Sequence, residues 1–101
     1  MRIKAGDTIP ITADLNADLT GATGVICRVM HAPTGVFLLS GAATVTDAAT
    51  GLVSFDFTAV QTATPGAYFV EWVVTFAGGD VQRFPGSSYQ EIVIDEAVPA
   101  V

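Results

Sequence analysis

The residue types that could carry out chemistry are few in this sequence. There is one histidine, His31, and one cysteine, Cys27. A catalytic histidine needs an orienting carboxylate and a nucleophile nearby, so we expect His31 to be an ordinary exposed residue at the end of a strand. Cys27 lies between Ile26 and Arg28 in an alternating stretch, which predicts a buried, unreactive thiol. The sequence therefore predicts no enzyme, and no cofactor or metal.

A calcium-loop spacing, D-x-N-x-D, occurs at Asp14, Asn16 and Asp18. A complete loop of this kind has glycine at its sixth position and a bidentate glutamate at its twelfth. Those positions hold Leu19 and Val25 here, so both anchors are missing. We expect the Asp and Asn side chains to bond to nearby backbone amides instead. Weak divalent-ion binding by residues 14–18 stays an alternative.

The charge balance excludes several classes of partner. The 101 residues include 4 Lys or Arg against 10 Asp or Glu, a formal charge of −6. Nucleic-acid binders and proteins that dock on anionic lipid need clusters of basic residues, so neither partner is expected. A single cysteine excludes an intrachain disulfide and a multi-cysteine zinc site. The length predicts one domain over residues 1–101, with its core at about 6–95 and a short tail at 96–101.

No segment of the sequence has the pattern of a signal peptide or a membrane span. The first four residues are followed by the polar stretch Gly6-Asp7-Thr8 rather than by an apolar run. The most apolar stretch, residues 68–76, contains Glu71 and is far too short to cross a bilayer. We therefore expect synthesis in a cytoplasm and no membrane partner.

The elements that must position these residues are strands, because apolar residues recur at a period of two and helical spacing is almost absent. A first strand is predicted with Ile9, Ile11, Ala13 and Leu15 on one face. The longest apolar row is Tyr68, Val70, Trp72, Val74 and Phe76.

Turn residues separate the predicted strands at 32–35, 47–51 and 64–66, and Gly78-Gly79 fits a tight two-residue hairpin. Seven or eight short strands with this spacing predict an all-β fold, an immunoglobulin-like antiparallel β-sandwich without a disulfide. Tyr68, just after the Pro65-Gly66 turn, is placed to bond back to that corner.

Two predicted strands carry apolar residues on both faces. If the alternating row that contains Cys27 faces the core, then Ile26 and Met30 point outward. In the long strand, Phe69 and Val73 point away from the row that contains Trp72. These four residues predict a protein–protein interface. Cover by neighbouring loops or the tail stays an alternative.

A run of segments at 6–11, 18–23, 47–53, 64–72, 74–76, 78–79 and 84–85 carries a family resemblance. The most telling segment is Thr64-Pro65-Gly66-Ala67-Tyr68, which continues to Glu71-Trp72. In order and spacing, from about residue 6 to 94, the chain resembles the N-terminal immunoglobulin-like domain of the phage baseplate upper protein (BppU) family.

The resemblance implies a non-enzymatic structural component of a tailed-phage or prophage virion, made in the bacterial host cytoplasm. Its partners would be other virion proteins of the tail, baseplate or neck, or the major capsid protein, with a homo-oligomer left open. Two alternatives stand beside this role: a capsid decoration protein, and an adsorption module that binds a cell surface or carbohydrate.

Overall fold

The computed structural model describes residues 1–85 and 90–97, and within them the chain forms nine strands and no helix. None of the described segments is therefore a helix that could cross a membrane. The strands are β1 (Arg2–Lys4), β2 (Ile11–Asp14), β3 (Ala22–His31), β4 (Phe37–Ala42), β5 (Thr44–Asp47), β6 (Leu52–Phe55), β7 (Gly66–Phe76), β8 (Val81–Phe84) and β9 (Gln90–Asp95).

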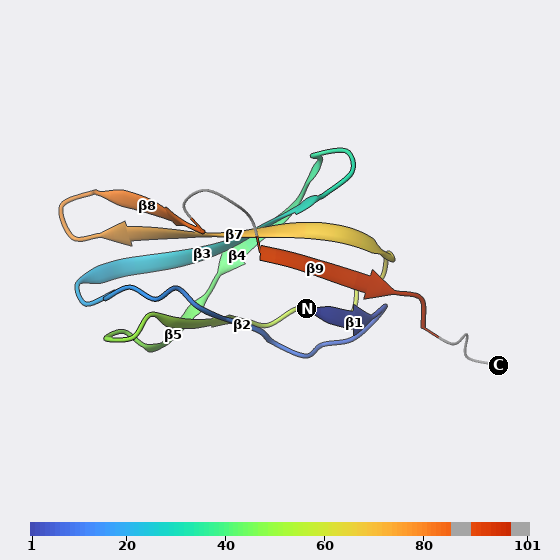
Figure 1. The fold of residues 1–101 in the computed structure, drawn as a ribbon, viewed down its shortest axis with the longest axis horizontal. Coiled ribbons are helices and arrows are strands. Elements are labelled where there is room, and N and C mark those ends of the chain that lie inside the picture. Colours follow the sequence, from blue (N-terminus) through green and yellow to red (C-terminus); the bar gives the residue numbers. More distant parts are fainter. Residues whose placement is uncertain (86–89, 98–101) are drawn as a thin grey trace.

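The strands form two sheets that pack as a sandwich. The larger sheet has six strands in the order β1-β9-β7-β3-β4, with β8 paired to β7 beyond the end of β9, and the smaller has the order β2-β6-β5. Figure 1 shows the two layers, with β3, β7 and β9 in one and β2 and β5 in the other. The chain changes sheet at Ala43, between β4 and β5. The predicted all-β, immunoglobulin-like sandwich is confirmed, with nine strands in the described residues rather than the predicted seven or eight, and Cys27 forms no disulfide.

The core lies between the sheets, and the alternation along β3 and β7 supplies much of it. Trp72 is fully buried, and its indole nitrogen donates a hydrogen bond to Gln90 Oε1 at 2.9 Å. The Tyr68 hydroxyl donates to the Thr64 carbonyl at 2.8 Å, so the predicted corner bond is confirmed. The buried apolar residues are Ile3, Ile11, Leu19, Val25, Cys27, Val29, Val53, Phe55, Phe57, Tyr68, Val70, Trp72, Val74, Ile92 and Ile94.

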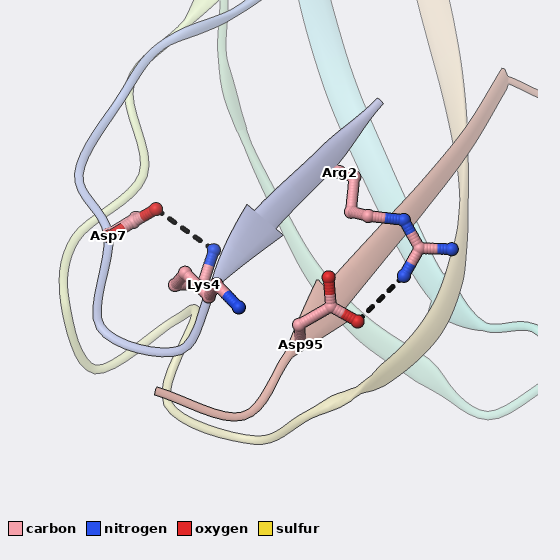
Figure 2. Close-up of polar contacts among 4 residues, drawn as sticks. All are labelled: Arg2, Lys4, Asp7 and Asp95. Carbon is pink, nitrogen blue, oxygen red and sulfur yellow. Dashed lines mark hydrogen bonds and ion pairs between the residues drawn. The ribbon is translucent and has the colours of Figure 1, made fainter. Parts of the chain in front are cut away.

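The N-terminal strand β1 was not predicted from the sequence. It pairs in parallel with β9, so this one pairing departs from the antiparallel pattern. Ile3 is 6% exposed and belongs to the core, although it precedes the predicted core boundary at about residue 6. Figure 2 shows the ion pair between Arg2 and Asp95, 2.7 Å long, and the Lys4 amide donating to Asp7 Oδ2 at 2.9 Å. No signal for β1 occurs in the sequence because a strand of three residues is too short to show an alternation of apolar and polar residues.

The first predicted strand begins later than expected. β2 starts at Ile11, and Ile9 is 55% exposed rather than on the buried face. The reason is Pro10, which has no backbone N–H to donate to a neighbouring strand.

The glycine hairpin is also longer than the predicted two-residue turn. Residues 77–80 connect β7 to β8, and the Phe76 amide donates to the Asp80 carbonyl at 2.8 Å across this loop. Gly78 and Gly79 both have φ values above +90°, at 94° and 93°, a conformation that glycine adopts readily.

Candidate functional site

The four predicted interface residues come together on one face of the larger sheet. In the β3–β7 pairing, Ile26 lies opposite Val73 and Met30 lies opposite Phe69. Their chain neighbours on both strands are core residues, except for the half-buried His31 that follows Met30, so all four side chains point away from the core. Ile26 is 44% exposed and the other three are half-buried.

A charged pair separates the two apolar pairs. Arg28 on β3 lies opposite Glu71 on β7, between the Ile26 row and the Met30 row. Arg83 on β8 lies opposite Val73, and its Nε atom is 3.6 Å from Glu71 Oε1. We call the set Ile26, Arg28, Met30, Phe37, Phe69, Glu71, Val73 and Arg83 the outer sheet face.

Phe37 extends this face onto the edge strand β4. It lies opposite Met30 and is 53% exposed. The Arg28 guanidinium carbon is 5.4 Å from the centre of the Phe37 ring, a cation–π geometry that holds the arginine against the face. An irregularity in the β3–β4 register between Val29 and Met30 leaves Leu38 as an extra residue on β4.

A shallow hollow of about 260 Å³ lies within the outer sheet face. Arg28, Met30, Phe37, Phe69 and Glu71 are among the residues that line it. Of the described lining residues, none is a serine, cysteine or histidine. A guanidinium and a carboxylate beside apolar side chains can make ion pairs and apolar contacts with a partner. They do not constitute a nucleophile with its base.

The two candidate nucleophilic or basic residues are both engaged in packing. Cys27 is completely buried, and burial raises the pKa of its thiol to about 12, as expected for an inert cysteine. The expectation that His31 is exposed is wrong, because it is half-buried. Its Nδ1 lies 2.9 Å from Thr34 Oγ1, and its ring packs edge-on against Tyr68 with 5.4 Å between ring centres.

The calcium-like loop is held by local hydrogen bonds. Asp14 Oδ1 accepts from the Asn16 amide and Asp18 Oδ1 accepts from the Thr20 amide, both at 2.9 Å. The hydrogen bonds from Thr20, through its side chain and then its backbone, lower the pKa of Asp18. The expected bonding to nearby amides is thus confirmed. Across residues 1–85 and 90–97, no three His, Cys, Asp or Glu side chains are grouped to hold a metal ion.

Two other hollows lie among the described residues, and the second of them shares Phe37 with the outer sheet face. One, of about 370 Å³, is lined by residues that include Trp72, Phe84 and Gln90. The Trp72 indole nitrogen and Gln90 Oε1 bond to each other there, so these groups are already satisfied. The other, of about 350 Å³, is an open depression near His31 and Tyr68 at the end of the β3–β4 hairpin.

No protein-family model and no curated protein matches this sequence. Among solved structures, the chain is similar to CopC from Methylosinus trichosporium OB3b, with a TM-score of 0.61 and 14% sequence identity. The match covers 99% of this chain and 87% of that chain. At this identity the likeness defines the class of fold, a β-sandwich, and nothing finer.

The predicted role as a structural component of a phage virion is wrong on this comparison. CopC, a solved structure that shares the fold, is not a phage protein. The same comparison contradicts the two alternatives, a capsid decoration protein and an adsorption module. The physical reason is that the segments behind the resemblance, such as the Thr64–Tyr68 corner and the glycine turns, build the sandwich itself, and one fold serves many functions. Membership of the baseplate upper protein family stays a prediction.

Proposed function

We propose that this chain is a non-enzymatic, protein-binding domain of immunoglobulin-like fold whose interface is the outer sheet face. One observation carries this proposal: the Ile26–Val73 and Met30–Phe69 pairs flank the Arg28–Glu71 pair on a single accessible face. Apolar side chains that water contacts favour burial against a partner, at roughly 25 cal/mol per Å².

The composition of the face supports a protein partner in particular. Aromatic residues, methionine and arginine are enriched at protein–protein interfaces, and Phe37, Phe69, Met30 and Arg28 supply all three kinds here. The charged centre would orient the partner rather than provide most of the affinity. The acidic balance of the whole chain, −6, disfavours a nucleic-acid partner or an anionic membrane.

Site-specific photo-crosslinking in the cells that make the protein tests the proposal. A photoreactive amino acid replaces Ile26 on the outer sheet face, and in a matched variant it replaces Leu52. Leu52 is similarly exposed, at 38% against 44% for Ile26, but lies on the smaller sheet. We expect a discrete protein adduct from position 26 only. Equal adducts from both positions, or none from position 26, would contradict a binding role for this face.

A further inference from the structure

We infer that the partner of the outer sheet face is a second copy of this chain, packed face to face about a two-fold axis that runs parallel to β3 and β7. This inference rests on the proposed function and names the occupant of the same face. The argument comes from the pattern of charges across the register of the two central strands.

The register between β3 and β7 makes this part of the outer sheet face complementary to the same part of a second copy in one orientation. A two-fold axis along the strands, midway between β3 and β7, exchanges the two strands without shifting residues along them. Arg28 of one copy then meets Glu71 of the second copy, and Glu71 of the first meets Arg28 of the second. The same rotation places Ile26 over Val73 of the second copy and Met30 over Phe69. Each apolar residue that the two central strands contribute to this face then meets an apolar one, and Arg28 and Glu71 each meet the opposite charge.

The other orientation of a face-to-face dimer is disfavoured by the same pattern. An axis across the strands, through the Arg28–Glu71 row, would place Arg28 against Arg28 and Glu71 against Glu71. Like charges brought together at an interface are strongly unfavourable. The charge pattern therefore selects aligned strands, which is also a common arrangement for two packed sheets.

The charges on the outer sheet face balance, which permits two copies of this acidic chain to associate there. Each copy carries −6 overall, which opposes self-association. The outer sheet face itself contains Arg28 and Arg83 as well as Glu71, and Glu91 lies at its border opposite Phe69. These two basic and two acidic residues balance, so the repulsion between copies is weakest where the faces meet.

The size of the face predicts a weak dimer. Four strands about 4.8 Å apart, over about seven residues at about 3.3 Å each, cover roughly 450 Å². Stable complexes bury about 800 Å² on each partner, so we expect a dimer that dissociates on dilution.

Charge reversal tests the pairing, with sedimentation of the purified full chain over a range of concentrations as the measurement. Arg28→Glu would bring two carboxylates together at both charged contacts of the dimer, and Glu71→Arg would bring two guanidinium groups together at the same contacts. We expect each variant alone to dimerise at least about tenfold more weakly than the wild type. An equimolar mixture of the two should recover association, because each acidic face then meets a basic one.

Matched variants control for overall charge and folding. Lys4→Glu and Asp56→Arg make comparable charge reversals at exposed positions on β1 and beside the smaller sheet, and should leave dimerisation unchanged. Circular dichroism checks the fold of each variant. Glu71 also pairs with Arg83, so Glu71→Gln replaces Glu71→Arg if the latter does not fold, and it too should weaken the dimer.

Three results would overturn the inference: a wild-type monomer at all concentrations, single reversals without effect, or a mixture that does not recover. The crosslinking at position 26 separates this failure from that of the proposed function. An adduct with a different protein would refute the second copy and retain the binding role. Absence of both an adduct and a dimer would refute both.

Discussion

The hydroxyl of Tyr68 ties the long strand β7 to the corner that precedes it, through its 2.8 Å bond to the Thr64 carbonyl. Tyr68→Phe removes this bond but keeps the ring that packs against His31. We expect the free energy of unfolding to fall by about 1 kcal/mol, the usual net contribution of one such bond. Equilibrium urea denaturation measures the change. An unaltered free energy would show that water replaces the hydroxyl at no cost.

At the same scale, Cys27 makes stability depend on pH. Burial raises the pKa of its thiol from 9.0 to about 12, so the folded state favours the protonated form. This contribution to stability is complete below pH 9 and is lost as the pH rises toward 12. We expect the free energy of unfolding to fall more between about pH 8 and about pH 10.5 in the wild type than in Cys27→Ala. Equal slopes in the two proteins would contradict the effect of thiol burial.

At the scale of elements, two loops brace each other beside the smaller sheet. The Leu15 amide donates to the Gly51 carbonyl at 2.9 Å, and the Leu19 amide donates to the Ala48 carbonyl at 2.7 Å. Gly51 has a φ of +84°, and a Cβ atom there would lie 2.5 Å from the Ala17 carbonyl oxygen. The close approach of these loops therefore depends on a glycine at this position.

Gly51→Ala should accordingly destabilise the protein more than Gly78→Ala. Gly78 has a similar φ, +94°, but a Cβ there would meet nothing within 4 Å. The Gly78 variant measures the backbone strain alone, about 1 kcal/mol. We expect Gly51→Ala to lower the free energy of unfolding by at least about 1 kcal/mol more than Gly78→Ala does, because the backbone at Ala17 must move. Thermal unfolding compares them, and equal midpoints would mean that the loops are not in firm contact.

At the scale of the whole molecule, β1 completes the larger sheet by joining the beginning of the described chain to β9. The Ala5 amide donates to the Asp95 carbonyl at 2.8 Å, and Ile3 lies opposite Ile94. Ile3→Ala should cost about 2 kcal/mol or more, since it leaves a cavity in the core. Ile9→Ala should change the free energy of unfolding by less than about 0.5 kcal/mol, since Ile9 is 55% exposed. Urea denaturation of the two variants measures both changes. Similar losses of unfolding free energy in Ile3→Ala and Ile9→Ala would contradict the placement of β1.

Much of the fold was predictable because the direction of a side chain along a strand is a local property. The period of two placed Val25, Cys27 and Val29 in the core and turned Ile26 outward, as the structure has it. The Pro65-Gly66 turn likewise predicted the Tyr68 corner. The same reasoning was wrong for Ile9, where the alternation ran past Pro10, and it gave no signal for β1.

The sequence by itself determined the all-β class, the core-facing rows and the outward direction of Ile26, Met30, Phe69 and Val73. Only the tertiary structure decided that β3 and β7 are neighbours and that Arg28 lies opposite Glu71. The reason is that facing along a strand follows from adjacent residues, whereas register between strands far apart in the chain is set by the packing of the entire core.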